Sequence, residues 1–311
     1  MNELEIIDLI RKTFQKRGFP LDDDVAYLPG GWAYKVDMLV RSTDVPKGMT
    51  PFQIGRKAVL ASMSDVSVKG VRAKYIMLSF AFEEKTDDEF IKDLLLGIKS
   101  VTEQYNLTLI GGDVNQSKDL SIDCILIGKY KKKVKRSGAK PGDDVYAVSE
   151  FGLTSLGLDY LLNGKEIRNE ELRRLALKAV YEPDPKIELN LELIDTGLVT
   201  ASMDSSDGLA FTLNEISEQS SVKIVLDDIP MSYELKELFR KEGRDPVNDA
   251  LYGGEEYQMV FTFKKGGESV IKELEKKHGV KIHKIGKVTE GKGVYFSNGK
   301  IIEKKGWVFN F

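Results

Sequence analysis

Residues 129–143 read KYKKKVKRSGAKPGD, and the pattern of the chain differs on the two sides of this stretch. A basic run leads into a turn cluster that contains Gly138, Pro141 and Gly142. Clusters of glycine and proline typically mark connections between folded segments. We therefore predict a boundary here, between a first domain of residues 1–137 and a second domain of residues 138–311.

The first domain combines helical and strand patterns. Its clearest helix is the amphipathic segment 87–105, where Phe90, Leu94, Ile98 and Val101 recur at helical spacing. Apolar and alternating runs predict strands between the helices. The other predicted helices are 4–16 and 52–69, and the predicted strands are 34–42, 74–82, 107–110 and 120–128, with a short strand through Tyr27.

The second domain alternates helices with strands. The predicted helices are 152–163, 168–180, 186–196 and 208–219, and the predicted strands are 144–148, 201–204, 222–226, 257–263 and 283–288. Such an order is typical of α/β or α+β proteins. The chain is therefore predicted to be a two-domain protein of the α/β and α+β classes.

The composition restricts the class of protein. A chain of 311 residues is long enough for two domains with separate cores. Its net charge of -3 provides no basic field that would attract nucleic acid. Cys124 is the single cysteine, which excludes an intrachain disulfide, and no long apolar run follows the acidic N-terminus. We expect a cytoplasmic protein with no nucleic-acid or membrane partner.

Several common catalytic motifs are absent from the sequence. It contains no P-loop, no Gly-x-Gly-x-x-Gly turn after a strand and no Gly-x-Ser-x-Gly elbow. The two histidines, His278 and His283, both lie in a lysine-rich segment near the C-terminus. A histidine-ligated zinc site and a Ser-His triad are therefore disfavoured.

Several aspartates share one context, because each ends an apolar strand or lies beside small residues. They are Asp24, Asp44, Asp65, Asp113, Asp204 and Asp207. Any one of them could instead cap a helix or hold a turn. Asp65 is harder to explain in this way, because it lies within a predicted helix, where aspartate has a low propensity.

A shared metal site would explain the whole set of aspartates. Clustered carboxylates repel one another unless protons or cations lie between them. Magnesium prefers oxygen ligands and commonly combines a few carboxylates with the phosphates of a substrate. Phosphoryl transfer requires positioning and charge neutralisation, and it needs neither histidine nor cysteine. These residues therefore favour a magnesium-dependent phosphotransferase.

The same motifs resemble, in residues and in order, those of the thiamine-monophosphate kinase family of the aminoimidazole-ribonucleotide synthetase-like superfamily. The resemblance covers nearly the whole chain. Each motif is weak alone, whereas the ordered set is specific. The motifs are DDDVA (22–26), STD (42–44), ASMSD (61–65) with KG (69–70), LIGGD (109–113), RSGAKPGD (136–143), DSSDGL (204–209) and GGEEY (253–257).

This resemblance implies an N-terminal mixed-sheet domain that pairs with that of a second subunit to form a barrel, so that the protein would be a homodimer. It also implies a C-terminal α+β domain and an ATP site between the halves. The implied reaction is a direct in-line attack by the phosphate of thiamine monophosphate on the γ-phosphorus of ATP, with magnesium. An attacking phosphate is already anionic at neutral pH, so no strong general base is required.

The resemblance further implies roles for single residues. The implied magnesium positions are Asp24, Ser42, Thr43, Asp44, Asp65, Asp113, Asp204 and Asp207. The implied ATP positions are Gly112, Asp113, Arg136 and Ser206. Within these sets we assign catalysis to Asp44, Asp65 and Asp207, and Arg136 could pair with a phosphate.

On the substrate side, Glu255 and Trp307 match positions of the family. A thiazolium is a cation and an indole face is a good partner for it, but Trp307 could equally be a core residue beside Val308 and Phe309. Many relatives carry a substrate-contacting histidine in a longer loop after the STD motif. The loop is shorter here and has no histidine, so we hypothesise that Lys47 meets the substrate phosphate instead.

Two alternatives stay open at this point. The chain could be another ATP-dependent enzyme of the superfamily with a different acceptor, although Asp113 favours the kinase, since aminoimidazole-ribonucleotide synthetases usually have glutamate there. It could also be a catalytically silent nucleotide-binding paralogue. The retained metal-position carboxylates argue against silence, and metal-dependent ATP turnover would separate the two classes.

Overall fold

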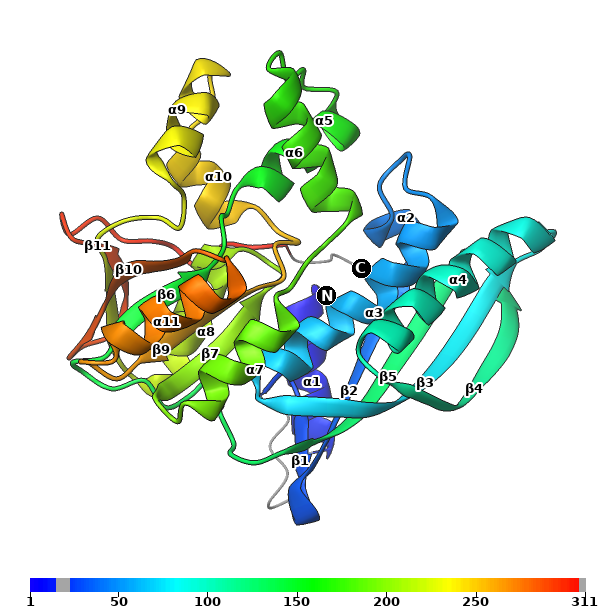
Figure 1. The fold of residues 1–311 in the computed structure, drawn as a ribbon, viewed down its shortest axis with the longest axis horizontal. Helices are drawn as coiled ribbons and strands as arrows, with labels where there is room; N and C mark the ends of the chain where they lie inside the picture. The colour runs from blue at the N-terminus through cyan, green and yellow to red at the C-terminus, as the bar shows by residue number, and fades with distance from the viewer. Residues whose placement is uncertain (15–22, 308–311) are drawn as a thin grey trace.

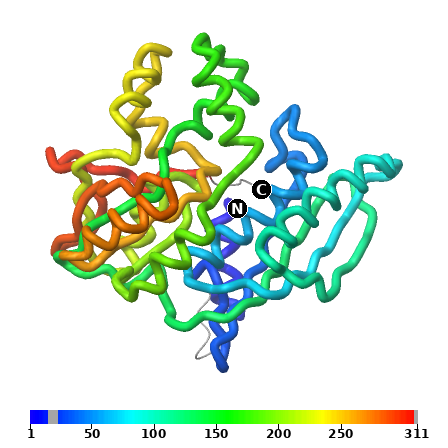
Figure 2. The backbone as a smooth tube through the Cα atoms, in the orientation of Figure 1, coloured from blue at the N-terminus to red at the C-terminus, as the bar shows by residue number. Residues whose placement is uncertain are grey.

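The structure is a computed structural model that describes residues 1–14 and 23–307, and it has two lobes, each built on one β-sheet (Figures 1 and 2). The first sheet has the order β1-β2-β5-β3-β4. Its β3 and β4 are parallel and its other pairs are antiparallel, so the sheet is mixed. The strands are β1 (Ala26–Leu28), β2 (Trp32–Val40), β3 (Val71–Glu83), β4 (Thr108–Ser117) and β5 (Ser121–Tyr130).

Two helices, α3 (Pro51–Val68) and α4 (Asp88–Gln104), cover one face of this sheet (Figure 1). Their backbones approach closely, because a Cβ at Gly55 would lie 2.1 Å from the carbonyl oxygen of Leu94. Likewise, a Cβ at Gly97 would lie 2.0 Å from the carbonyl oxygen of Phe52. Glycine is therefore required at both positions for this helix crossing.

The opposite face of the first sheet is open and partly apolar. Val36 and Met38 of β2 expose 64% and 59% of their surface. Every residue of the edge strand β4 is exposed, including Leu109 and Val114. Among the described residues this apolar edge is unpaired, an arrangement that is unusual in a monomer.

The second sheet has the order β11-β8-β10-β6-β9-β7 and is also mixed, because β11 and β8 are parallel. Its central strands β6 and β9 are buried along their whole length, which explains their almost continuous apolar sequence. The strands are β6 (Asp144–Val148), β7 (Val199–Ser205), β8 (Lys223–Leu226), β9 (Gln258–Phe263), β10 (Ile282–Thr289) and β11 (Gly293–Phe296).

The remaining helices surround the sheets, and α5, α6, α9 and α10 project beyond the second sheet as a separate layer (Figure 1). They are α1 (Glu3–Phe14), α2 (Arg41–Asp44), α5 (Leu153–Asn163), α6 (Glu170–Tyr181), α7 (Ile187–Asp195), α8 (Leu209–Ser220), α9 (Tyr233–Lys241), α10 (Pro246–Tyr252) and α11 (Glu268–His278), with a 3-10 turn at Pro29–Gly31.

The two lobes share helix α3. Ile187 and Leu191 of α7 belong to the core under the first sheet, and Val68 of α3 belongs to a core of the second lobe. Asn190 of α7 donates a hydrogen bond from Nδ2 to Oγ of Ser67, at 2.9 Å. The end of α3 is therefore packed between the lobes.

The predicted two-domain fold with mixed sheets is confirmed, whereas the boundary at residues 137 and 138 stays a prediction. Several local predictions differ from the structure. The strand predicted at 34–42 ends at Val40, and the strand predicted at 107–110 continues to Ser117. Elements α2, α9, α10, α11 and β11 were not predicted. The polar segment after Gly112 is extended because it pairs in parallel with β3, a long-range contact that local propensity does not contain.

Candidate active site

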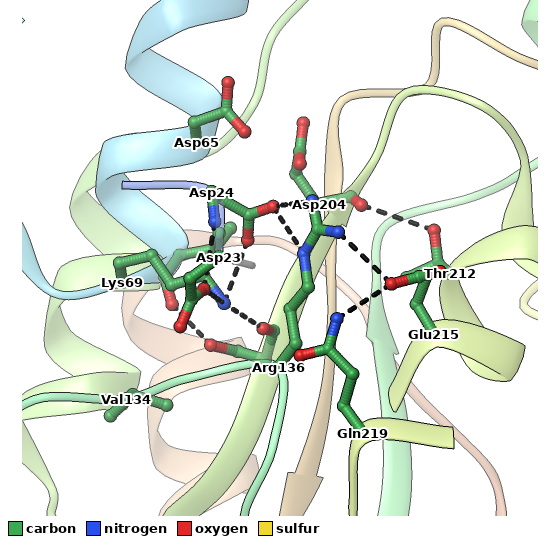
Figure 3. Close-up of polar contacts among 12 residues, drawn as sticks. Asp23, Asp24, Asp65, Lys69, Val134, Arg136, Asp204, Thr212, Glu215 and Gln219 are labelled. Carbon is green, nitrogen blue, oxygen red and sulfur yellow. Dashed lines mark hydrogen bonds and ion pairs between the residues drawn. The ribbon is translucent and has the colours of Figure 1, made fainter. Parts of the chain in front are cut away.

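Three aspartates from separate elements meet between the lobes. Asp24 precedes β1, Asp65 lies in α3 and Asp204 lies in β7. All three are buried, and one carboxylate oxygen of each lies within 4.8 Å of the others. We call them the three-aspartate centre. Figure 3 shows them around the ion pairs of Asp24.

Cationic side chains surround this centre. Lys69 places Nζ 2.9 Å from Oδ2 of Asp24 and 2.9 Å from Oδ1 of Asp23. Arg136 donates from Nε to Oδ1 of Asp24 at 2.8 Å, on the other side of that carboxylate (Figure 3). Lys35 of β2 lies 2.6 Å from Oδ2 of Asp65.

These cations divide the aspartates electrostatically. Burial opposes the charge of Asp24, but Arg136 and Lys69 outweigh it and hold the pKa of Asp24 well below its ordinary value. Burial raises the pKa of Asp65 well above its ordinary value, although Lys35 opposes the shift. Burial and the charge of Asp24 raise the pKa of Asp204 to about 6. A further cation would be needed to keep Asp65 and Asp204 both ionised.

The donor set of the centre fits magnesium. It offers carboxylate oxygens from three elements in a buried place, and Ser64 donates from Oγ to Oδ2 of Asp204 at 2.9 Å, which orients that carboxylate. A hard divalent cation prefers such oxygen ligands and leaves room for phosphate. Asp24, Asp65 and Asp204 would hold the ion.

The DSSDGL and GGEEY motifs lie side by side next to this centre. The amide of Glu255 donates to the carbonyl of Ser206 at 2.6 Å, and the amide of Tyr257 donates to the carbonyl of Ser205 at 2.9 Å. Burial and the charge of Asp204 raise the pKa of the neighbouring Asp207 to about 7. Both motifs therefore lie beside the three-aspartate centre.

The C-terminal segment reaches the same motif. The amide of Trp307 donates to the carbonyl of Asp207 at 3.3 Å, and a Cβ at Gly306 would lie 2.6 Å from that oxygen. Trp307 exposes 59% of its surface, so it is not a buried core residue. Val308 and Phe309, its proposed neighbours in a core, lie outside the described residues.

A buried lysine connects the STD motif with the GGEEY motif. Lys57 of α3 exposes only 1% of its surface. Its Nζ donates to the carbonyl oxygen of Asp44 at 2.6 Å and to Oε1 of Glu255 at 2.6 Å. Lys57 thereby fixes the position of Glu255 relative to the loop after β2.

The structure does not bring all predicted residues together. The carboxylate of Asp44 accepts a hydrogen bond from the amide of Val40 at 2.6 Å, so it satisfies a local backbone group beside its own short helix. Ser42, Thr43 and Lys47 are exposed. None of these residues belongs to the three-aspartate centre, and their predicted roles stay predictions.

Gly112 and Asp113 lie farther away, on the exposed edge strand β4. One row of paired residues crosses the sheet from β4 to β2. In this row Asp113 of β4 pairs with Ser79 of β3, and Ser79 pairs with Asp123 of β5. Asp123 in turn pairs with Met38 of β2. Two strands therefore separate β4 from β2. Within one chain, the glycine-rich motif and the three-aspartate centre are distinct places.

Sequence reasoning identified Arg136 but missed the roles of Lys35 and Lys69 and one further aspartate, Asp37. Lys35 and Asp37 lie on the same face of β2 as the buried Ala33 and Leu39, and Nζ of Lys35 lies 3.9 Å from Oδ1 of Asp37. Charged residues at core-facing positions of a strand were the available signal. Lys69 was quoted only as part of a motif, and its complete burial is visible only in the fold.

Comparison with known proteins agrees with this geometry. Residues 22–130 match the family described as AIR synthase related protein, N-terminal domain, and residues 140–297 match AIR synthase related protein, C-terminal domain. The thiamine-monophosphate kinase of Nitrosopumilus maritimus is 34% identical over 99% of this chain and 98% of that protein. That of Aquifex aeolicus is 31% identical over 99% and 97%.

Solved structures agree as well. A structure of AaThiL complexed with AMPPCP and TMP superimposes with a TM-score of 0.87 at 30% identity, and covers 99% of this chain and 97% of that one. Thiamine monophosphate kinase from Aquifex aeolicus gives a TM-score of 0.84 at 29% identity, over 97% of each chain. This chain belongs to the thiamine-monophosphate kinase family, within the AIR synthase related proteins.

Proposed function

We propose that this chain transfers the γ-phosphoryl group of ATP to the phosphate of thiamine monophosphate and forms thiamine diphosphate, with the three-aspartate centre as its magnesium site. Family membership supports the reaction, and the relative AaThiL has been solved with AMPPCP and TMP. The observation that carries the site is the convergence of Asp24, Asp65 and Asp204 from three elements, with oxygens within 4.8 Å.

The chain's own residues would position the reactants. Magnesium, when bound, neutralises phosphate charge and orients the phosphates of ATP. Arg136 donates from Nε to Asp24 and from NH1 to Oε2 of Glu215, the latter at 3.3 Å. Its guanidinium is therefore held in position before any ligand binds. The lobes bury the three aspartates, and the anionic acceptor phosphate requires no general base from the protein.

The substrate side would be built around Glu255. Lys57 holds one oxygen of Glu255, and the exposed Trp307 lies beside Asp207 at the edge of the same place. A carboxylate and an indole face both suit the cationic thiazolium of thiamine monophosphate. We retain Ser206 and Asp207 as proposed ligand-binding and catalytic residues, because both lie in the turn that contacts Glu255.

A homodimer would complete this site. The open face of the first sheet carries exposed apolar residues, and β1 pairs only with Trp32, Ala33 and Tyr34 of β2 among the described strands. The rest of that β2 edge could pair with β4 of a second copy, which closes a barrel from two sheets. Such pairing would bring Gly112 and Asp113 of one chain toward β2 of the other, and hence toward its three-aspartate centre.

The direct test is to incubate the purified protein with ATP, magnesium and thiamine monophosphate and to look for thiamine diphosphate by chromatography. Diphosphate formed by the wild type supports the proposal. Magnesium-dependent ATP binding without diphosphate would indicate another acceptor, and the absence of both would overturn the assignment. Among residues 1–14 and 23–307, no helix combines the length and apolarity needed to cross a membrane, and a cytoplasmic location stays a prediction.

Lys47 needs its own test, because its backbone carbonyl is held by the hydroxyl of Tyr181 at 2.7 Å while its side chain is exposed. If its ammonium meets the substrate phosphate, Lys47→Ala raises KM for thiamine monophosphate with little change in kcat. Lys85→Ala, at an exposed turn elsewhere, is the matched control. An unchanged KM in the Lys47 variant would remove this residue from the substrate site.

A further inference from the structure

Lys35 occupies an unusual position for a lysine, because it points from β2 into the acidic region under the first sheet. Its side chain exposes only 17% of its surface, and its neighbours in the sheet are covered by α3. The ordinary place for a strand lysine is the solvent face, where it discourages edge pairing. The solvent-facing positions of this strand are instead taken by Val36 and Met38, which are apolar and exposed.

The ammonium of Lys35 lies between two carboxylates. Its Nζ is 2.6 Å from Oδ2 of Asp65 and 3.9 Å from Oδ1 of Asp37. Asp65 is itself one of the three aspartates whose oxygens converge. The lysine therefore occupies the space that would otherwise lie open between Asp37 and the centre.

The other two cations of the site have a different arrangement. Lys69 and Arg136 both bind Asp24, on opposite sides of its carboxylate (Figure 3). Lys35 alone among these three cations contacts Asp65. Removing it would leave Asp37 and Asp65 facing each other as two acidic groups, an arrangement that attracts a divalent cation.

From this geometry we infer that the Lys35 ammonium is a resident cation of the active site, which takes the place of one divalent ion between Asp37 and Asp65. The inference rests on the proposed magnesium site and makes it more specific, because it limits where the divalent ions bind. They would bind on the side of Asp24 and Asp204, while fixed protein charge neutralises the Asp37 side. A tethered ammonium is always present, so this share of the charge neutralisation does not depend on the magnesium concentration.

The test counts bound metal rather than activity. Wild type, Lys35→Met and Lys35→Arg are titrated with Mn²⁺ alone, and free Mn²⁺ is measured by electron paramagnetic resonance. We expect Lys35→Met, which is neutral and of similar length, to bind one more Mn²⁺ per chain than the wild type, and Lys35→Arg to match the wild type. Equal stoichiometry in wild type and Lys35→Met would overturn the inference. Lys129→Met makes the same change in net charge at an exposed place over Trp32 and should match the wild type.

A measurement on the unaltered protein covers the case in which Lys35→Met does not fold. Reductive methylation of the wild type, followed by peptide mass spectrometry, reports how accessible the ammonium of Lys35 is. If Lys35 keeps its place, its labelling stays low at saturating Mg²⁺. Labelling that rises with Mg²⁺ would mean that the metal displaces the lysine, which contradicts the inference. Thiamine diphosphate formation is assayed separately, so failure of the proposed reaction can be distinguished from failure of this inference.

Discussion

The three-aspartate centre and strand β4 were predicted to serve one active site, yet they differ in almost every physical respect. Asp24, Asp65 and Asp204 are buried, ion-paired or hydrogen-bonded, and held by three elements of one chain. Gly112 and Asp113 are exposed on an edge strand that has no outer partner among residues 1–14 and 23–307. A single chain brings the first group together, whereas the second group lies apart from it in the same chain.

This difference shows which structural information an ordered set of motifs contains and which it lacks. Motif order identifies residues that act together, but it does not say whether they converge within one subunit or between two. Burial and edge pairing supply the missing information, because an exposed apolar strand indicates a partner.

Loss of a carboxylate from the centre should have the largest effect. Asp204→Asn removes an anionic oxygen from the proposed metal site, and thiamine diphosphate formation should fall by about 10²-fold or more, since charge neutralisation carries most of this type of catalysis. Asp195→Asn makes the same chemical change in an ion pair with Arg72 at the surface and should retain activity. Comparable rates for Asp204→Asn and the wild type would remove Asp204 from the site.

A mixing experiment asks whether β4 belongs to the partner's site. Asp113→Asn and Asp204→Asn should each be inactive. If each site takes Asp113 from one chain and Asp204 from the other, a mixed dimer keeps one intact site, and a fully exchanged mixture should recover roughly a quarter of the wild-type activity. The two variants are co-expressed, or their mixture is treated with a low concentration of denaturant, so that subunits exchange.

The opposite result of mixing is equally informative. If Asp113 serves the site of its own chain, every site in the mixed dimer lacks one aspartate and the mixture stays inactive. Size-exclusion chromatography with light scattering confirms that mixed dimers have formed. Activity of Asp113→Asn alone would mean that β4 has no catalytic part.

An intermediate effect is expected at Lys57, which connects elements of the same chain. Lys57→Met leaves Glu255 without its buried ammonium, so KM for thiamine monophosphate should rise by about tenfold, and the melting temperature should fall because the buried pair is broken. Lys99→Met, in an exposed helical pair with Glu103, should change neither quantity. Steady-state kinetics and thermal denaturation measure both effects.

The smallest effect is expected at Glu256, a buried carboxyl group that lacks the lysine and arginine contacts of Asp24. Its Oε1 accepts from the amide of Gly152 at 2.6 Å, and burial raises its pKa to about 7 from an ordinary 4.5. Because the folded protein then binds the proton more tightly than the unfolded chain, this contribution to stability is complete below about pH 4.5 and is lost as the pH rises toward 7.

Glu256→Gln replaces the carboxyl group by a neutral amide and should flatten the decrease of melting temperature between pH 5 and 7, with an effect on the order of 1 kcal/mol. Glu273→Gln, an exposed position on α11, is the control and should follow the wild type. Identical pH profiles for Glu256→Gln and the wild type would show that Glu256 is ionised in the folded protein at these pH values.

Some parts of the fold and site could be predicted from sequence for physical reasons. Helix α4 could be predicted because its apolar residues recur at helical spacing. Asp65 could be predicted as a functional residue because aspartate has a low propensity for the interior of a helix. The burial of Lys69 could not be predicted, since lysine is almost always exposed and its partner Asp24 is distant in sequence. The STD motif illustrates the same limit, because its aspartate satisfies a local backbone amide at Val40.

Helix α3 has a mechanical consequence. It carries Lys57, Ser64 and Asp65 toward the active site, lies on the first sheet, and contributes Val68 to a core of the second lobe. A hinge motion between the lobes would have to separate this helix from the core of one lobe or the other. We therefore expect the two lobes to behave as one rigid body during turnover, and admission of substrate to depend on motion of smaller parts, such as the loop around Lys47.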